Sequence, residues 1–498
     1  MKAGISQTIS EFIKQAIQMD IVPPFDEVYL RNRLVDFLHL DDYVEPKALN
    51  KLPDLLDSMN DMISYAIHNK IIEDYQYERE IFEAKIMNLV TPLPSVVNNT
   101  FWEKYKESPK QATDYFYQLS QDNNYIKTRN IAKNIFFETE SPYGNLEITI
   151  NLSKPEKNPK EIAAQKDKVS TNYPKCVLCL ENEGYKGHAN HAARENHRVV
   201  RMKIQDEIYG LQYSPYVYYN EHSIFLNEMH KPMVVDQTAI ENLLEIIDVL
   251  PHYFVGSNAD LPIVGGSILS HDHYQGGHYK FPIEDAKLVE EVELADHPHV
   301  KASIVQWPLS VLRLKSENKK DLVEAVVHIM YTWENFSDTD FDIVSHTGET
   351  RHNTVTPIAR FNEGLYVMDV VLRNNRTTEE YPDGIFHPHP DVHHIKKENI
   401  GLIEVMGLAI LPPRLVVELQ QLEDFLLDKK PLSEVAEIHQ NWARELKEES
   451  FDEENVTKFI QQKVGDKFTR VLEDAGVYKQ TEDGLKGFKN FIEKLNSN

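Results

Sequence analysis

The chain has 498 residues, of which 41% are hydrophobic and 27% are charged, as in folded globular proteins rather than disordered or fibrous ones. At about 150 residues per domain, this length predicts two to four domains. The 79 acidic residues outnumber the 53 basic ones and give a formal net charge of −26. Such a charge argues against a nucleic-acid backbone or an anionic membrane as the main partner, because both would repel the protein.

No segment has the properties of a membrane-spanning helix or of a secretory signal. The best apolar run, residues 400–411, is shorter than the ~18 residues that a spanning helix needs, and it contains Glu404. The N-terminal segment carries Glu11, Lys14 and Asp20 within its apolar pattern, which a signal peptide would not. Two cysteines cannot form a disulfide framework, so we expect a cytoplasmic protein.

Residues 1–130 are predicted to form a helical N-terminal extension. Ile5, Ile9 and Phe12 recur at helical spacing, and the pair at 23–24, Pro-Pro, ends this pattern. Two further apolar stripes follow, at 30–38 and 52–59. Nothing in this region suggests chemistry, so we interpret it as a structural layer.

Residues 131–290 are predicted to form a first half of mixed strands and helices. Alternation of apolar and polar residues predicts a β-hairpin over 135–152 with one buried face. Asp236 is a favourable N-cap for a helix whose apolar residues lie on one face. The other elements expected in this half are strands at 216–226 and 267–280 and a loop at 153–171.

Residues 291–420 repeat this pattern and are predicted to form a second half. Strands are expected at 303–314 and 365–373, and helices at 321–335 and 400–411. Residues 421–498 are charged and helical, and we expect them to form a structural tail. The alternation of strands, short hairpins and helices favours an α+β fold with antiparallel sheets and flanking helices.

The stretch 270–278, Ser-His-Asp-His-Tyr-Gln-Gly-Gly-His, is the strongest candidate for a reactive site. On a strand, His271, His273 and Gln275 would share one face, and the glycines would let a ligand approach the backbone. A single histidine is more often a satisfied structural residue, and 21 histidines allow chance clustering. Two imidazoles and an amide in line nevertheless favour a functional face.

Cys176 and Cys179 form a CxxC pair with the spacing of a zinc knuckle, because two thiolates three residues apart can bind one tetrahedral ion. The chain has no second CxxC, so the remaining ligands would be histidines. The downstream candidates are His188, His191, His197, His222, His230 and His271. Two buried free thiols are the alternative, and the spacing alone does not decide between them.

Arginines are candidates for binding phosphate, because the planar guanidinium suits phosphate oxygens. Arg129 and Arg360 belong to this group, although most arginines in so acidic a chain pair with carboxylates. The sequence contains no P-loop, no Rossmann glycine fingerprint and no G-x-S-x-G motif. The commonest phosphate-binding and hydrolase folds are therefore excluded.

The H-x-H-x-Q motif, with a CxxC about a hundred residues upstream, resembles the galactose-1-phosphate uridylyltransferases of the histidine-triad superfamily, and in particular their longer bacterial type. The segments that carry the resemblance are YVYYNEH at 216–222, RHNTVTPIAR at 351–360, VLRNNRTTEE at 371–380 and GIFHPHPDVHHIKKENIG at 384–401. The resemblance implies two histidine-triad-like halves, residues 131–290 and 291–420, and a homodimer.

The resemblance further implies a double displacement. His273 attacks the α-phosphorus of UDP-glucose, glucose 1-phosphate leaves, and galactose 1-phosphate then takes the uridylyl group as UDP-galactose. Neutral imidazole is a good nucleophile near pH 7. Gln275 replaces the third histidine of the superfamily's hydrolases, and its amide can hydrogen-bond phosphoryl oxygens but cannot shuttle protons.

Two alternatives to this function stay open at this point. One is another nucleotidyltransferase or a nucleotide-sugar phosphorylase of the same superfamily. The other is a zinc-stabilised binding module without catalysis, in which the histidines are incidental.

The ligands and substrate contacts also follow from the resemblance. The family's structural zinc ligands match Cys176, Cys179, His230 and His271, the third placed by the segment 225–233. A second site, for iron, would use residues among Glu284, His352, His387 and His389. Asn220 matches a residue near the nucleotide and Glu404 one that binds hexose hydroxyls, and we add Arg129 and Arg360 as candidate substrate contacts.

This sequence departs from the family pattern at three positions near the motif. Asp272 replaces a proline and Tyr274 replaces a glycine. A serine that is expected to hold a phosphate falls on Ile268, with Ser267 and Ser270 beside it. The departures bear on the phosphate contacts and not on the nucleophile.

Overall fold

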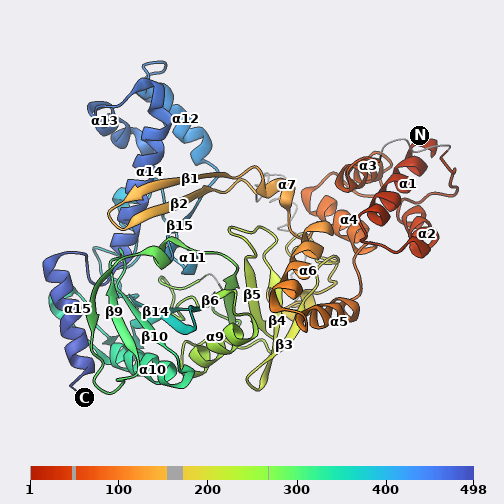
Figure 1. Cartoon of the computed structure of the whole chain (residues 1–498). Helices are drawn as coiled ribbons and strands as arrows, with labels where there is room; N and C mark the ends of the chain where they lie inside the picture. The colour runs from red at the N-terminus through yellow and green to blue at the C-terminus, as the bar shows by residue number, and fades with distance from the viewer. Residues whose placement is uncertain (1, 47–51, 154–171, 267, 498) are drawn as a thin grey trace. The chain divides into compact units, whose positions relative to one another are not determined.

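The computed structural model describes residues 2–46, 52–153, 172–266 and 268–497 (Figure 1). Most of the expected loop at 153–171, and also Ser267, lie outside the described residues. The chain divides into two compact units. The first comprises Met1–Arg129, Lys154–Val217 and Ser223–His230, and the second Asn130–Ser153, Tyr218–His222 and Lys231–Asn498. The predicted domain boundaries at 130, 290 and 420 stay predictions.

The first unit is helical over its N-terminal part, as predicted. Its helices are α1 (Lys2–Gln18), α2 (Glu27–Phe37), α3 (Leu55–His68), α4 (Gln76–Asn88), α5 (Pro94–Tyr105) and α6 (Pro109–Asp122), and the short α7 (Thr128–Ile131) follows. Ile9 and Phe12 of α1 are fully buried, together with Leu34 of α2 and Met62 of α3. The periodicity therefore identified the buried face of α1 correctly.

Three antiparallel strands, in the order β3-β4-β5, complete the described part of the first unit. They are β3 (Val200–Ile204), β4 (Glu207–Tyr213) and β5 (Ser223–Asn227). The strand expected at 216–226 is therefore too long at its start. Residues 218–222 belong instead to the second unit and form a turn beside its strand β7 (His273–Gly277).

The second unit contains an antiparallel run of strands in the order β7-β6-β13-β14-β10-β9-β8. Besides β7, these are β6 (Phe254–Gly256), β8 (Leu288–Val292), β9 (Lys301–Val305), β10 (Val311–Ser316), β13 (Asn353–Asn362) and β14 (Leu365–Asn374). The short strands β11 (His346–Thr347) and β12 (Thr350–Arg351) pair with each other.

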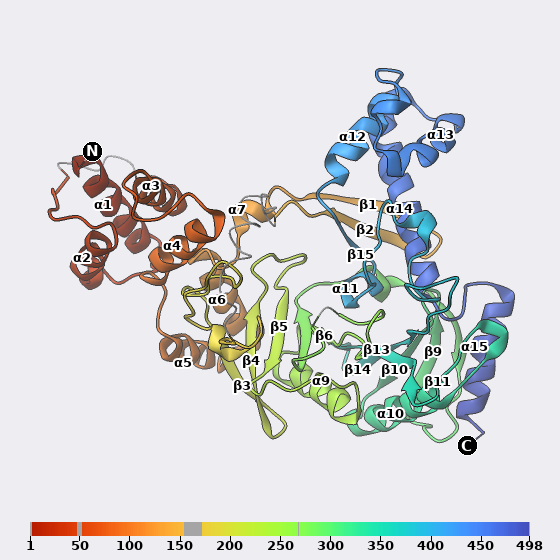
Figure 2. The ribbon, with the colours of Figure 1, turned by 180° about the vertical axis from the view of Figure 1, so that it is seen from behind.

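Helices α9 (Gln237–Val249) and α10 (Lys319–Asn335) lie along one face of this sheet (Figures 1 and 2). The indole N–H of Trp333 in α10 donates to the carbonyl oxygens of Thr354 and Arg373, at 3.0 and 3.1 Å. Because these two residues lie opposite each other on β13 and β14, Trp333 anchors α10 across both strands.

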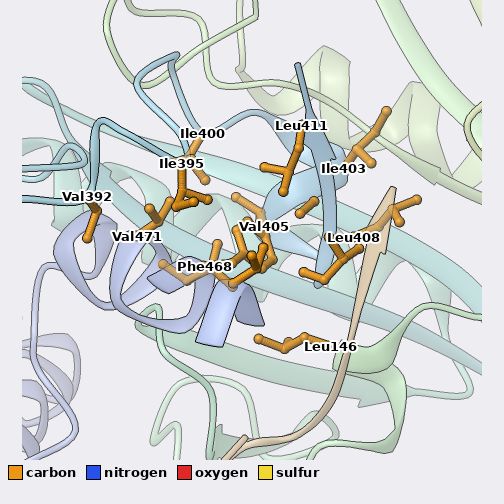
Figure 3. Packing of buried hydrophobic residues seen from close by; sticks show 14 of the residues in the cluster. Leu146, Val392, Ile395, Ile400, Ile403, Val405, Leu408, Leu411, Phe468 and Val471 are labelled. Carbon is orange, nitrogen blue, oxygen red and sulfur yellow. The ribbon is translucent and has the colours of Figure 1, made fainter. Parts of the chain in front are cut away.

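A separate three-stranded sheet forms around the predicted hairpin. Its strands are β1 (Ile135–Ser141), β2 (Gly144–Ile150) and β15 (Leu408–Leu411), and β15 runs parallel to β2. Leu146 of β2 and Leu408 of β15 pack against Phe468 of helix α14 (Val456–Ala475) in one apolar cluster (Figure 3). The hairpin and its buried face are therefore confirmed.

The remaining helices lie near the C-terminus, as expected for the tail. They are α12 (Leu415–Leu426), α13 (Gln440–Glu448), α14 and α15 (Glu482–Leu495). Together with the antiparallel sheets they confirm the α+β class. Among the described residues, no helix is both long and apolar enough to cross a membrane.

Three further expected elements differ from the structure. Residues 400–411 form helix α11 (Leu402–Val405) and strand β15 rather than one helix, with a turn at Gly407. Periodicity cannot separate a buried helix from a buried strand in so short an apolar run. The strand expected at 303–314 is interrupted between β9 and β10, and that expected at 267–280 is only β7.

Helix α9 begins at the predicted cap, because Oδ1 of Asp236 accepts a hydrogen bond from the backbone N–H of Ala239 at 3.0 Å. We expect Asp236→Ala to lower the free energy of unfolding of the second unit by about 1 kcal/mol, since one helical N–H loses its partner. Urea denaturation measures this change. Thr238→Ala, on an exposed position of the same turn, is the control and should change stability by less than about 0.5 kcal/mol. Equal effects of the two substitutions would contradict the role of Asp236.

Candidate active site

Strand β7 places His273 and Gln275 on one face and Tyr274 on the other. Tyr274 is buried, and its hydroxyl accepts a hydrogen bond from Nδ2 of Asn242 in α9 at 3.2 Å. Tyr274, at a position where the resemblance leads us to expect glycine, thus lies on the helix side, away from the candidate site. His271 precedes the strand, so the expected alignment of three side chains is correct for two of them.

The ring of His273 is held in one tautomer. Its Nδ1 lies 2.7 Å from the carbonyl oxygen of His271. Because a carbonyl oxygen only accepts, Nδ1 carries the proton and Nε2 keeps its lone pair. The side chain is 6% exposed, and burial lowers the pKa of His273 against the opposing influence of the same carbonyl and of Asp272. The imidazole is therefore neutral near pH 7 and its Nε2 is nucleophilic.

The amide of Gln275 is oriented by a second histidine. Its Oε1 lies 3.1 Å from Nε2 of His222, and since this oxygen only accepts, the ring nitrogen donates. Burial lowers the pKa of His222 to about 4, although the hydrogen bond to Gln275 opposes this shift. The NH₂ group of Gln275 is then the half of the amide that can donate to a phosphoryl oxygen.

The four predicted zinc ligands come together. Cys176, Cys179, His230 and His271 each offer one ligand atom, and these atoms lie within 4.8 Å of one another. The two Sγ atoms are 3.6 Å apart, and Sγ of Cys179 is 3.2 Å from Nδ1 of His230. Tetrahedral zinc with sulfur ligands at about 2.3 Å would separate the two sulfurs by about 3.8 Å, so the donor set fits this ion.

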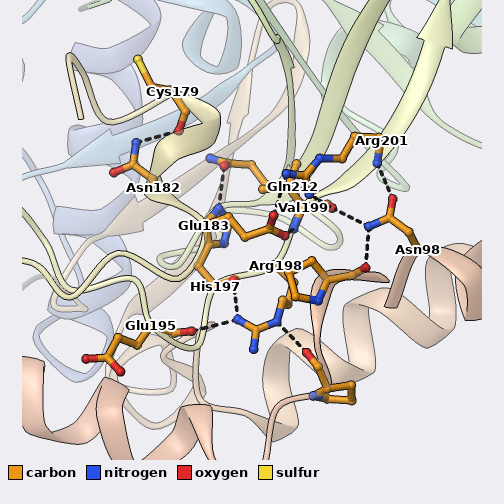
Figure 4. A network of polar contacts seen from close by, with 12 residues as sticks. Asn98, Cys179, Asn182, Glu183, Glu195, His197, Arg198, Val199, Arg201 and Gln212 are labelled. Carbon is orange, nitrogen blue, oxygen red and sulfur yellow. Dashed lines mark hydrogen bonds and ion pairs between the residues drawn. The ribbon is translucent and has the colours of Figure 1, made fainter. Parts of the chain in front are cut away.

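Backbone contacts support the residues around the cluster. Nδ2 of Asn182 donates to the carbonyl oxygens of Cys176 and Cys179, both at 2.8 Å, which closes the CxxC loop. Figure 4 shows the bond to Cys179. The backbone N–H of Asp272 donates to the carbonyl oxygen of Lys231 at 2.7 Å. Proline, which the family resemblance leads us to expect at 272, has no N–H and could not make this bond.

Burial affects the chemistry of the thiols. Cys179 is 4% exposed, and burial raises the pKa of its thiol to about 11. A neutral thiol is a poor ligand, so the cysteine binds as a thiolate only when a cation replaces its proton. Four protein ligands would fill a tetrahedral zinc ion, which is the arrangement of structural rather than catalytic sites.

Two predicted substrate contacts lie in different settings. Asn220 is exposed, and its Nδ2 donates to the carbonyl oxygen of His278 at 3.2 Å. Glu404, on α11, is 9% exposed, and its Oε1 accepts a hydrogen bond from Nζ of Lys396 at 3.0 Å. Their roles in binding stay predictions.

Both predicted arginines are paired with carboxylates. Arg129 forms ion pairs with Asp54 and Asp57 on the surface. Arg360 is buried on β13, and its Nη1 lies 2.9 Å from Oδ2 of Asp369, which also binds Arg313. A substrate phosphate would compete with these carboxylates for either guanidinium, and a role in substrate binding stays a prediction for both.

Comparison with known proteins identifies the family. The galactose-1-phosphate uridyl transferase N-terminal domain family matches residues 21–232, and the corresponding C-terminal domain family matches residues 245–444. The chain belongs to the galactose-1-phosphate uridylyltransferase family. Members of this family are nucleotidyltransferases, so the chain is an enzyme of this class.

Individual relatives of the uridylyltransferase family match over the whole chain. The galactose-1-phosphate uridylyltransferase of Lactococcus lactis subsp. lactis is 52% identical over 99% of this chain and 100% of its own length. Galactose-1-phosphate uridylyltransferase 1 of Streptococcus pneumoniae is 50% identical over 98% and 99%. A solved structure of a yeast Ap4A phosphorylase with AMP matches 65% of this chain and 94% of its own, with 12% identity and a TM-score of 0.36.

The second metal site that the uridylyltransferase resemblance implied, for iron, stays a prediction. Among the described residues, the Cys/His cluster is the one group of three or more such side chains close enough to share an ion. The four iron candidates contact other groups: His352 contacts Thr347 and Asn375, His387 contacts Asn399, His389 contacts the carbonyl of Ile385, and Glu284 pairs with Arg360.

One residue of the site was not recognised from the sequence. His222 appeared there only among several possible zinc ligands, whereas the structure pairs it with Gln275. The available signal was its position in the segment YVYYNEH, which carries part of the resemblance to the uridylyltransferases.

Removing one thiol tests the metal cluster. We expect Cys176→Ser to lower the bound zinc from about one ion per chain to near zero and to lower the melting temperature, because a structural zinc stabilises the fold that holds it. Mass spectrometry of the native protein and thermal denaturation measure the two effects. His188→Ala, which alters a nearby histidine outside the cluster, should keep its zinc. A Cys176→Ser variant with unchanged zinc content would contradict the assignment.

Proposed function

We propose that the protein transfers a uridylyl group from UDP-glucose to galactose 1-phosphate through a covalent intermediate on His273. The observation that carries this proposal is the neutral imidazole whose Nδ1–H is held by a carbonyl, so that Nε2 is nucleophilic. The adjacent Gln275 supplies an amide donor on the same face of β7. The names of relatives that match the whole chain support the choice of galactose 1-phosphate as acceptor.

In the first step, Nε2 of His273 forms a bond to the α-phosphorus of UDP-glucose. The bond between that phosphorus and the oxygen of the departing phosphate breaks, and glucose 1-phosphate leaves with the electron pair. This leaving group is a phosphate monoester and departs without a proton donor. A glutamine can therefore replace the third histidine of the superfamily's hydrolases.

The residues around the ring stabilise the charges that develop in this step. The imidazole becomes cationic when Nε2 is uridylylated, and the carbonyl of His271 then accepts a stronger hydrogen bond from Nδ1. The NH₂ of Gln275 donates to a phosphoryl oxygen of the pentacovalent transition state. The amide is neither an acid nor a base near pH 7, so it cannot help an attacking water by proton transfer, which limits hydrolysis of the intermediate.

In the second step, a phosphate oxygen of galactose 1-phosphate attacks the same phosphorus, and the imidazole leaves as the neutral ring. UDP-galactose is the product. Glu404 would accept hydrogen bonds from hexose hydroxyls and Asn220 would contact the nucleotide. Zinc bound by the Cys/His cluster would stabilise the segment before His273 without taking part in the transfer. We also expect a cytoplasmic homodimer.

The uridylylated enzyme is the decisive test. Incubation with UDP-glucose labelled in the uridylyl group should leave about one label per active chain, and His273→Ala should lose both the label and at least about 10⁴-fold in kcat. Mass spectrometry of the intact protein and of its peptides measures the adduct. His68→Ala, on helix α3, controls for adventitious labelling and should behave like the wild type.

Two results would contradict the proposal. The first is retained turnover in a folded His273→Ala variant. The second is release of a nucleoside diphosphate that requires inorganic phosphate and not galactose 1-phosphate, which would instead indicate the phosphorylase.

A further inference from the structure

We propose that His222 is a positioning residue that sets the orientation of the Gln275 amide. His222 is itself positioned by the other residues of the segment 218–222. The inference deepens the proposed function, because it assumes that the amide of Gln275 contacts the transferred phosphoryl group. No candidate residue recognised from the sequence has this role.

The segment 218–222 packs directly on the backbone of β7. The hydroxyl of Tyr219 donates to the carbonyl oxygen of Gly276 at 3.1 Å. A Cβ atom at Gly277 would lie 2.7 Å from the carbonyl oxygen of Glu221 and 2.8 Å from the ring of Tyr219. These distances are too short for any side chain at position 277. The absence of a side chain at Gly277 therefore allows the segment 218–222 to approach the strand.

The His222 ring is fixed within this segment. It is 4% exposed, and its centroid lies 4.5 Å from that of Tyr219 and 5.5 Å from that of Tyr218. Its Nε2 reaches Gln275, whereas its Nδ1 makes no hydrogen bond within the part of the chain that the structure describes. Only the tautomer protonated at Nε2 is stable there, because a proton on Nδ1 would be buried without an acceptor.

This tautomer selects one of the two orientations of the amide. A carboxamide can rotate by 180° and exchange its oxygen with its NH₂ group. The Nε2–H group of His222 points at Gln275 and attracts the amide oxygen. In the reversed amide, the NH₂ group would face this N–H, and two donors would repel each other. The NH₂ of Gln275 is therefore turned away from His222 and presented to the phosphoryl oxygens. In the reversed orientation, the amide oxygen would face those anionic oxygens.

The matched test uses a second pair with the same chemistry. Nε2 of His197 lies 2.9 Å from Oε1 of Gln212 (Figure 4). His197 is 1% exposed, and its ring stacks on that of Tyr125 with centroids 4.4 Å apart. Its Nδ1 likewise makes no hydrogen bond among the described residues. His197→Phe therefore removes the same kind of buried bond as His222→Phe without touching Gln275.

We expect His222→Phe to lower the rate of uridylylation by about 10-fold, because roughly one oriented hydrogen bond is lost in the transition state. The KM for UDP-glucose should change by less than about 2-fold. His197→Phe should leave both values unchanged, although it should lower the melting temperature by a similar amount. In a Gln275→Ala background, His222→Phe should cause no further loss. Single-turnover kinetics with labelled UDP-glucose measure the rate of uridylylation in the wild type and in each of these variants.

A wild-type rate in His222→Phe, or a full additional loss in the Gln275→Ala background, would overturn the inference. If His222→Phe does not fold, the tautomer of His222 in the wild-type protein decides, by ¹⁵N NMR of histidine-labelled protein. A proton on Nε2 supports the inference, and a proton on Nδ1 overturns it. The NMR measurement needs no turnover, so it tests the inference separately from the proposed function. Absence of a uridylyl adduct in the wild-type protein would instead contradict the proposed function.

Discussion

The proton on Nδ1 of His273 is held by the carbonyl oxygen of His271, 2.7 Å away, and this bond decides which ring nitrogen can meet a substrate. Burial keeps the ring neutral, since it lowers the pKa of His273. Neither condition is sufficient alone, because a neutral ring with the opposite tautomer would present an N–H to the phosphorus. In the proposed mechanism, the short spacing between two histidines of one motif therefore supplies both the nucleophile and its orientation.

His271 links the nucleophile to the Cys/His cluster. Its carbonyl accepts the bond from His273, while its fully buried side chain offers a ligand atom to the group formed with Cys176, Cys179 and His230. The backbone bond between Asp272 and Lys231 joins the neighbours of two of these ligands. A cation in the cluster would thus restrain the residue whose carbonyl orients the ring of His273, the proposed nucleophile.

The alternation of β7 separates structural from reactive side chains. Tyr274 faces α9 and satisfies its hydroxyl with Asn242, whereas His273 and Gln275 face the other way. On that side the segment 218–222 lies against the strand, with the hydroxyl of Tyr219 bound to Gly276 and the ring of His222 bound to Gln275. The carbonyl oxygen of Gly276 and the amide oxygen of Gln275 therefore already accept hydrogen bonds before a substrate binds. The NH₂ group of Gln275 then points away from His222.

The sequence by itself determined the features that depend on neighbours along the chain. Helical spacing predicted the buried face of α1, alternation predicted the hairpin of β1 and β2, and Asp236 marked the start of α9, because each arises from contacts a few residues apart. The motif at 271–275 and the CxxC also indicated the family, and the resemblance to that family predicted the four residues of the Cys/His cluster. Tertiary structure decided how 400–411 divides between helix and strand, and that His222 contacts Gln275 and lies outside the Cys/His cluster. Those outcomes depend on which distant segments pack together, and a local pattern carries no information about that packing.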